Sequence, residues 1–374
     1  MATPPLVSCI IPAYNAADTI VRAIESARRQ TCPHIEVVVV DDGSTDGTES
    51  TVRARFPDVT CVRHTANRGP AAARNSGARA ARGAVLAFLD ADDEWLPVKT
   101  ELQLDALAGL PKVGALFTGS LLVAGRWGNR IFPPRARASV GYLTCSYMLW
   151  GSRTPVPPAS AMIPASTFAS LGGFDERREL LEDELWVRMA GRGLQLARLE
   201  LPLYVQHVTA GSVTSDARWM SDAQLATVEL CAPHSPVGRG IGMSDEEYAR
   251  LRRKWVIAGA LSLVRAGHSG HARQRLCREL EATGRPRYLI GLLFLVAHCP
   301  SLLRTMVRAA WLPGRLLHYL RARAGYWRYA KLLEAHPTDA GRFQQEFPRA
   351  RRRRPMLCAG RAFRGAAPLT LPRE

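Results

Sequence analysis

The sequence predicts an α/β protein, with a mostly parallel sheet flanked by helices and a C-terminal helical region after it. Over the first 120 residues, short β-branched runs alternate with helix-like segments, as in consecutive βαβ units. Beyond Trp219, apolar residues recur at helical spacing. A chain of 374 residues is long enough to bury more than one core. We therefore expect a sheet domain followed by a separate helical part.

The predicted sheet starts with two apolar runs, residues 6–12 and 35–40, each bounded by turn residues, as in strands buried on both faces. Residues 16–30 lie between them and carry an apolar helical face. Further strands are expected at residues 59–63, 85–90, 113–117, 160–164, 194–199 and 203–207. Further helices are expected at residues 71–81, 180–190, 246–263, 271–282, 287–298 and 315–333.

The charge of the chain is concentrated in its C-terminal third. The formal net charge is +17, from 50 basic and 33 acidic residues, and residues 248–374 alone hold 26 basic and 6 acidic residues. We expect a first domain over residues 1–214, a basic helical region over 215–347, and an Arg-rich tail over 348–374 that is disordered. Such a basic region suits an anionic membrane surface, a nucleic acid or an anionic substrate.

No segment of the sequence has the length of a membrane-spanning helix. The longest apolar stretch runs from Tyr288 to Leu303 and contains His298 and Pro300, whereas a span needs roughly 20 apolar residues. The N-terminus has no signal-peptide pattern, and the eight scattered cysteines suit free thiols in a reducing cytosol. We therefore expect a cytoplasmic protein.

Polar residues follow three of the predicted strands. They are residues 12–15 after the first strand, residues 41–47 after the second, and residues 90–93 after the fourth. In an open α/β sheet, ligands bind beyond the carboxyl ends of the strands, and these ends meet at one edge. Turn formation and helix capping explain any one cluster well, but they explain poorly why so many carboxylates gather at one edge.

Asp90 and Asp92 form the sharpest of these features, because they directly follow a buried strand. Two carboxylates held two residues apart can ligate a hard divalent cation such as Mg²⁺ or Mn²⁺. A cation with so few protein ligands shares its shell with substrate phosphates. The sequence therefore predicts a site for a nucleoside diphosphate and a divalent metal.

Four segments resemble, in the same order, the motifs of the family 2 glycosyltransferases: residues 7–15, 38–46, 67–75 and 88–93. The resemblance runs from about residue 6 to residue 214. It implies the glycosyltransferase-A fold, a nucleotide-sugar donor, a divalent metal (Mn²⁺ or Mg²⁺) and inversion at the anomeric carbon. The sequence lacks the QxxRW motif of processive members, which favours the transfer of one sugar or few.

The resemblance also implies roles for single residues. Asp42 is expected to accept a hydrogen bond from the base, and a carboxylate acceptor favours the N3–H of uracil. Asp92 is expected to ligate the metal, and His207 to complete the metal shell or close over the diphosphate, with a structural histidine as the alternative. The full expected nucleotide-sugar site is Pro12, Tyr14, Asn15, Asp42, Ser44, Arg74, Asp90 and Asp93.

Residues 182–184, Glu-Asp-Glu, match the acidic motif that carries the acid–base chemistry of this family. An inverting transfer needs one general base to deprotonate the acceptor hydroxyl, and the metal stabilises the leaving diphosphate. We expect Asp183 to be that base and Glu182 to support it. The alternative is that these residues only cap a helix, whose dipole favours acidic residues in the first turn.

The leading hypothesis is a glycosyltransferase that acts on a hydroxyl of a saccharide or glycolipid in cell-surface polysaccharide biosynthesis, at the inner face of the membrane. A polyprenyl-phosphate sugar synthase is the alternative in the same fold. Its acceptor, a lipid phosphate, is already anionic, so it would not need Asp183 as a general base. An Arg-rich nucleic-acid-binding protein is an alternative of a different class. Beside a transferase domain, the basic region favours peripheral membrane contact over nucleic acid.

Overall fold

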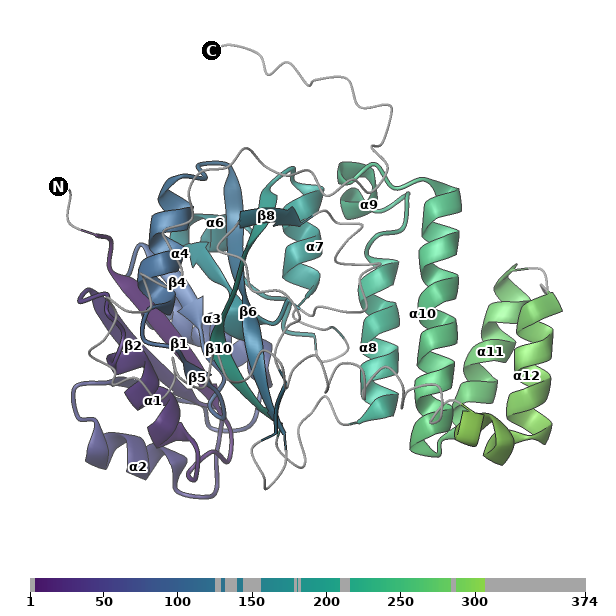
Figure 1. Cartoon of the computed structure of the whole chain (residues 1–374), viewed down its shortest axis with the longest axis horizontal. Coiled ribbons are helices and arrows are strands. Elements are labelled where there is room, and N and C mark those ends of the chain that lie inside the picture. Colours follow the sequence, from purple (N-terminus) through teal and green to yellow (C-terminus); the bar gives the residue numbers. More distant parts are fainter. Residues whose placement is uncertain are drawn as a thin grey trace, which may run out of the picture.

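The computed structural model describes residues 4–124, 129–131, 140–143, 156–177, 180, 183–208, 216–283 and 287–306. Its strands are β1 (Val7–Ala13), β2 (Ile35–Asp41), β3 (Thr60–Arg63), β4 (Val85–Phe88), β5 (Glu94–Trp95), β6 (Val113–Ala124), β7 (Asn129–Ile131), β8 (Val140–Leu143), β9 (Met162–Pro164) and β10 (Gln195–Val208). Within these residues they form one sheet, in the order β3-β2-β1-β4-β9-β6-β10-β5, with β7 beside β6 and β8 beside β10. The predicted sheet is therefore confirmed (Figure 1).

The helices of the sheet domain are α1 (Ile20–Arg28), α2 (Thr48–Arg55), α3 (Pro70–Ala80), α4 (Lys99–Ala108), α6 (Ala165–Ser170) and α7 (Glu184–Gly191). The helices that follow are α8 (Ala217–Glu229), α9 (Pro236–Gly240), α10 (Asp245–Ala266), α11 (Ser269–Thr283) and α12 (Arg287–His298). The helices expected at 246–263, 271–282 and 287–298 are thus confirmed. The helix expected at 315–333 and the Arg-rich tail lie outside the described residues.

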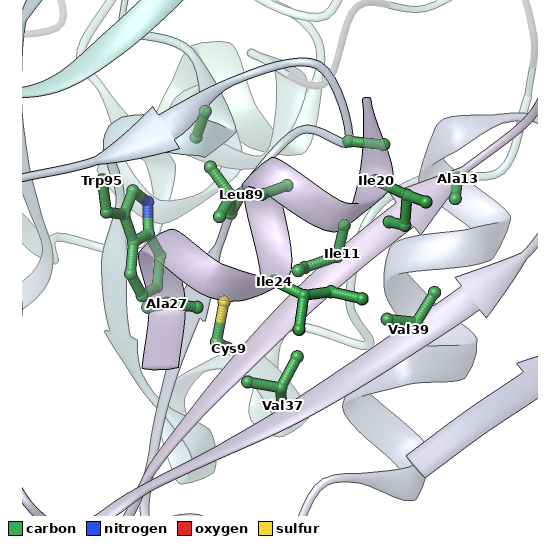
Figure 2. Close-up of a cluster of buried hydrophobic side chains, with 14 of the residues drawn as sticks. Cys9, Ile11, Ala13, Ile20, Ile24, Ala27, Val37, Val39, Leu89 and Trp95 are labelled. Carbon is green, nitrogen blue, oxygen red and sulfur yellow. The ribbon is translucent and has the colours of Figure 1, made fainter. Parts of the chain in front are cut away.

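Separate apolar cores cover the two faces of the sheet, because successive side chains of a strand point to opposite faces. On one face, Ile11 of β1 packs with Ile24 of α1 (Figure 2). On the other, Ile10 belongs to a core that includes Trp186 of α7. Gly77 of α3 lies so close to this face that a Cβ there would sit 2.4 Å from Cγ2 of Ile10. The sheet is therefore covered by helices on both faces, as predicted.

The direction of the strands brings four polar segments to one edge of the sheet. β1 pairs in parallel with β2 and with β4. β9 pairs antiparallel with both β4 and β6, and β6 pairs in parallel with β10. β10 therefore runs in the same direction as β1, β2 and β4. The carboxyl ends of these strands, near Tyr14, Asp42, Asp90 and His207, all lie at this edge.

Several element boundaries differ from the expectation. Two strands were expected at 194–199 and 203–207, but β10 is a single strand that pairs with β6 along its length, with shifts of register near Leu199 and Pro202. β4 ends at Phe88, so Asp90 lies in the turn that follows. α7 begins at Glu184 and not at residue 180. α4 was not predicted, because its buried side chains include Lys99 and Gln103 and so lack an apolar period.

The helical region packs on the sheet domain through α7. Val187 of α7 belongs to an apolar cluster with Val228, Cys231 and Leu251 of the helical region. The backbones of α7 and α9 are in close contact, because a Cβ on Gly240 would lie 1.8 Å from the carbonyl oxygen of Gly191. Beyond this junction α8, α10, α11 and α12 stand in sequence, each against the next (Figure 1).

No helix among the described residues is long and apolar enough to cross a membrane.

Candidate active site at the carboxyl edge of the sheet

The loops after β1 and β2 are locked together by Asn15. Its backbone φ is +49°, which asparagine tolerates better than most residues. The backbone amide of Asn15 donates to Oγ of Ser44, and the side-chain Oδ1 of Asn15 accepts from the backbone amide of Thr45, both at 2.9 Å. Tyr14 is 50% exposed beside this contact. Residues 14, 15 and 44 of the expected nucleotide site therefore lie together, with Tyr14 and Asn15 exposed and Ser44 buried.

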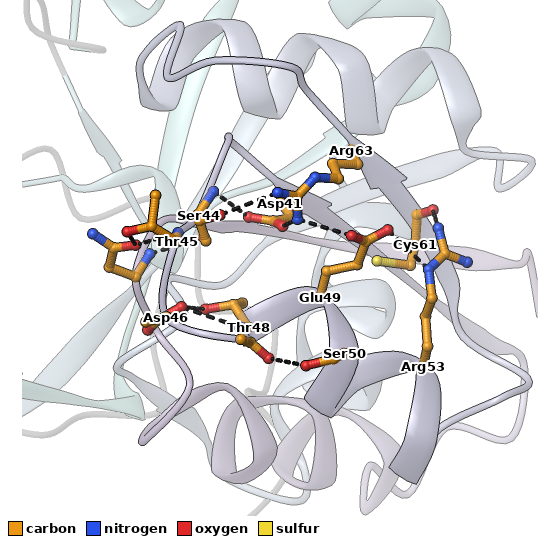
Figure 3. Close-up of polar contacts among 12 residues, drawn as sticks. Asp41, Ser44, Thr45, Asp46, Thr48, Glu49, Ser50, Arg53, Cys61 and Arg63 are labelled. Atoms are coloured by element: carbon orange, nitrogen blue, oxygen red, sulfur yellow. Dashed lines mark hydrogen bonds and ion pairs between the residues drawn. The ribbon is translucent and has the colours of Figure 1, made fainter.

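Asp41 is a structural residue of the β2 loop. It is fully buried, and its carboxylate accepts from the backbone amide of Ser44 at 2.9 Å and from Nη1 of Arg63 at 2.6 Å. Arg63 also pairs with Glu49 at 2.8 Å, so the loop is tied to α2 (Figure 3). Because Asp41 is fully buried and both of its carboxylate oxygens accept hydrogen bonds, we assign it a structural role in the loop.

Asp42 holds the segment that leads into α3. Its Oδ1 lies 2.6 Å from Nδ1 of His64 and accepts from the backbone amide of Arg68 at 2.9 Å, and its Oδ2 accepts from the amide of Gly69 at 2.8 Å. The side chain is buried. These bonds position the start of α3, and base recognition by Asp42 stays a prediction.

Arg74 of α3 is buried beneath the edge and points to the aspartate cluster. Its Nη2 donates to Oδ1 of Asp90 at 2.6 Å, and its guanidinium carbon lies 5.9 Å from the ring centre of Phe174. The next residue, Asn75, donates to the carbonyl of Phe174 and accepts from its amide, both at 2.9 Å. The turn at residues 172–176 is therefore fastened to the helix that presents Arg74.

The structure brings His207 to the aspartate cluster. The amide of His207 donates to Oδ1 of Asp93 at 2.9 Å, and its Nε2 lies 2.7 Å from Oε1 of Glu94. Arg22 of α1 donates to the carbonyl of Asp92 at 2.6 Å. Burial of Asp93, followed by repulsion from Asp90, raises the pKa of the Asp93 carboxyl well above its usual range.

Asp183 occupies the N-cap position of α7, but its side chain makes no capping hydrogen bond. Its neighbour Glu184 has a different role: the Glu184 carboxylate is buried, pairs with Nε of Arg188 at 2.5 Å, and accepts from the amide of Asp175 at 2.8 Å. Arg188 in turn donates to the carbonyl of Gly173 at 2.5 Å. Glu182 lies outside the described residues.

A model of glycosyl transferase family 2 matches residues 8–144, which contain the first three strand ends and the aspartate cluster. Residues 8–144 belong to glycosyl transferase family 2. Among curated relatives of this glycosyltransferase domain, the protein WfaP of Escherichia coli, named as a UDP-Glc:α-D-GlcNAc-diphosphoundecaprenol β-1,3-glucosyltransferase, is 41% identical over 100 residues. The putative teichuronic acid biosynthesis glycosyltransferase TuaG of Bacillus subtilis is 42% identical over 105 residues.

These matches cover only part of each chain. They span 26% and 27% of this chain, and 40% and 41% of WfaP and TuaG. Among solved structures, residues 1–349 of S. aureus TarS in complex with UDP-GlcNAc superpose with a TM-score of 0.55 at 18% identity, covering 83% of this chain and 92% of that one. The superposition confirms the predicted glycosyltransferase-A type of fold.

The donor set at the carboxyl edge of the sheet fits a divalent cation that is shared with a substrate. Within the described ranges, no three His, Cys, Asp or Glu side chains are placed to hold a metal ion by themselves. Burial raises the pKa of Asp93, and the negative charges of Asp90 and Asp92 add to this effect, so a further positive charge would be favoured at this edge. A cation held by Asp92 and His207, with phosphate oxygens completing its shell, would supply the missing charge.

Sequence reasoning identified the aspartate cluster and two of its partners, Arg74 and His207, but missed Arg22 and Glu94. Arg22 carried no signal, because it reaches Asp92 across 70 positions of sequence. Glu94 could have been found, since it continues the acidic run after Asp93. The structural role of Glu184 also had a local signal, the four-residue spacing to Arg188 on one helix face.

Proposed function

We propose that the chain is an inverting glycosyltransferase that moves a sugar from a nucleotide sugar, with UDP favoured, to a hydroxyl of a saccharide or glycolipid. The proposal rests above all on one arrangement: Arg74, Asp90, Asp93 and His207 meet at the carboxyl edge of the sheet, and the first three lie in the part that matches glycosyl transferase family 2. The names of WfaP and TuaG support a role in cell-surface polysaccharide biosynthesis.

The donor binds across the ends of β1, β2 and β4. The nucleoside lies against Pro12, Tyr14, Asn15, Asp42 and Ser44, and the diphosphate and sugar lie toward Arg74, Asp90 and Asp93. The buried guanidinium of Arg74 is held in place by Asp90 at 2.6 Å, so it is oriented before the donor arrives. UDP is favoured because a carboxylate at position 42 accepts from the N3–H of uracil.

Asp92 and His207 hold a divalent metal, Mn²⁺ or Mg²⁺, at this edge. When bound, the cation neutralises the charge that develops on the leaving diphosphate. His207 is positioned for this role by two contacts, from its amide to Asp93 and from its imidazole to Glu94. The glutamate therefore orients the imidazole ring.

Asp183 acts as the general base. Its carboxylate takes the proton of the acceptor hydroxyl while the acceptor oxygen forms a bond to the anomeric carbon. The bond from that carbon to the phosphate oxygen breaks on the opposite face, so the configuration inverts. Glu182 supports the base, and the buried Glu184–Arg188 pair holds the start of α7 in place.

The helical region contacts the inner face of the cell membrane, where a lipid-linked acceptor is presented. Exposed large apolar side chains support this contact, and they lie on α12 and just beyond it: Phe294, Leu295, Leu302 and Met306. The excess of basic residues after residue 248 suits an anionic lipid surface.

A screen of nucleotide sugars tests the proposed activity. Each donor is incubated with the purified chain and Mn²⁺ or Mg²⁺, and hydrolysis and thermal stabilisation are measured, with a chelator as control. We expect at least one UDP-sugar to be hydrolysed or to raise the melting temperature only when metal is present. A lack of metal-dependent response to every nucleotide sugar would overturn the assignment.

A further inference from the structure

A pocket lined by apolar and many charged side chains lies between α8, α10 and α11, away from the sheet edge. Its volume is about 370 Å³. The lining includes both signs of charge: Arg218, Arg252, Arg275 and Arg278, and Asp222, Glu229 and Glu279. The three helices that form it stand next to one another in Figure 1. Nothing in the proposed transfer reaction uses this pocket.

Two of the four arginines form ion pairs with all three carboxylates of the lining. Arg252 pairs with Glu229, with 2.8 Å between Nε and Oε1, and also with Glu279. Arg275 pairs with Asp222. In the described part of the chain, no carboxylate forms an ion pair with the other two lining arginines, Arg218 and Arg278. The walls of the pocket therefore carry more positive than negative charge.

The guanidinium of Arg275 is built into the base of the pocket. Arg275 is 8% exposed, and its Nη1 donates to the carbonyl of Ser221 at 2.8 Å. Gly259 of α10 makes room for it, because a Cβ there would lie 2.4 Å from the same Nη1. A glycine inside a long helix costs about 1 kcal/mol relative to alanine. Close approach of this guanidinium accounts for the glycine at that position.

The positive groups of the pocket lie near enough to repel one another. Burial lowers the pKa of Arg275, the attraction of Asp222 opposes this, and the smaller repulsion by Arg278 and Arg252 adds to the lowering. Arg218 and His271 lie in the first turns of α8 and α11, where the helix dipoles add partial positive charge. An anion in the pocket would relieve this repulsion.

We infer that this pocket binds a phosphate or diphosphate group, held by Arg218 and Arg278 at its exposed mouth and by Arg275 at its base. The planar fork of N–H donors on a guanidinium matches phosphate oxygens in pairs. Free phosphate and pyrophosphate offer this chemistry, and so does the head group of a phosphorylated lipid. The inference does not depend on the proposed transfer reaction, because the pocket lies outside the glycosyltransferase domain.

Pyrophosphate binding to the full chain tests the inference, measured by calorimetric titration with a chelator present, so that metal-bound pyrophosphate at the sheet edge does not contribute. The test variant is R218Q/R278Q, whose side chains are exposed and remain polar. The matched control is Arg273→Gln, an exposed arginine of α11 that does not line the pocket. We expect the dissociation constant to rise about tenfold or more in the double variant and to stay unchanged in the control.

Vesicle binding separates the two sources of the phosphate group. Phosphatidylcholine vesicles with and without phosphatidic acid are sedimented with each variant. Loss of binding to phosphatidic acid in R218Q/R278Q alone identifies a lipid head group, and vesicle binding that is equal in all variants identifies a soluble phosphate. Equal pyrophosphate affinity in all three proteins would overturn the inference, as would an equal loss in Arg273→Gln, which would indicate a diffuse basic surface.

Discussion

Asp93 accepts a hydrogen bond from the backbone amide of His207, with 2.9 Å between Oδ1 and N, although 114 positions separate the two residues. The bond fixes the end of β10 against the aspartate cluster that follows β4. Because the donor is a backbone amide, the placement of residue 207 does not depend on its side chain. The imidazole is left to contact Glu94 and, as proposed, the metal.

We expect His207→Ala to weaken metal activation without unfolding the site. The amide that Asp93 uses remains, whereas the proposed metal ligand is lost. The metal concentration that gives half-maximal transfer should rise about tenfold or more. The measurement is a Mn²⁺ titration of transfer activity, with His34→Ala, an exposed histidine, as the matched control. An unchanged metal dependence would assign His207 a structural role.

Asp183→Asn is expected to reduce kcat by about a hundredfold or more while the affinity for UDP and the melting temperature stay unchanged. The amide cannot take a proton from the acceptor, but it has the same shape. Glu184→Gln is the contrasting variant: it breaks the buried pair with Arg188 and should lower the melting temperature. Full turnover by Asp183→Asn would exclude Asp183 as the base and favour an acceptor phosphate that needs none.

Alanine substitutions at two neighbouring glycines, Gly172 and Gly173, test the contact between the turn at residues 172–176 and α3. Both have positive φ, +77° at Gly172 and +76° at Gly173, so alanine is strained at either position. A Cβ on Gly173 would also lie 2.5 Å from Oδ1 of Asn75, whereas a Cβ on Gly172 meets nothing within 4 Å. In chemical denaturation, Gly172→Ala should cost about 1 kcal/mol. Gly173→Ala should cost about 1–3 kcal/mol more. Equal costs would contradict the contact.

Because Lys99 is buried, we expect the stability of the folded chain to depend on pH. The lysine side chain is fully buried over the ring of Trp95, with Nζ donating to Gln103 at 2.7 Å. Burial lowers the pKa of Lys99 from 10.5 to about 7 in the folded chain. Between these values the unfolded chain binds a proton that the folded chain does not, so this lysine makes stability rise with pH. Below about pH 7 its full penalty, on the order of 4 kcal/mol, is present.

Lys99→Met removes this group while keeping its length. Denaturation at about pH 6 and about pH 9 should show the variant gaining stability over the parent chain at the lower pH, and about half of that gain should vanish at the higher pH. A difference that does not change between the two pH values would show that Lys99 does not titrate in this range.

Local patterns in the chain predicted β1 to β4, α1 and α3 in the right order, because apolar periodicity and turn residues act over a few positions, but they missed short elements such as α2 and α6. They failed where the buried face of an element is polar, as in α4 with Lys99 and Gln103. They also failed at β10, where a break in the apolar pattern near Pro202 is a shift of register inside one strand. Such shifts depend on the partner strand, which the local pattern does not contain.

For the site, motif order identified the candidate carboxylates, since each follows a strand end within a few residues. Only the fold distinguishes their roles. Asp41 and Glu184 turn out to hold backbone and arginine groups, whereas Asp93 meets His207 from a distant strand. The reason is physical: the residue type and its neighbours in the chain set which chemistry is possible, but hydrogen-bond partners and burial are set by contacts between segments that only the folded sheet brings together.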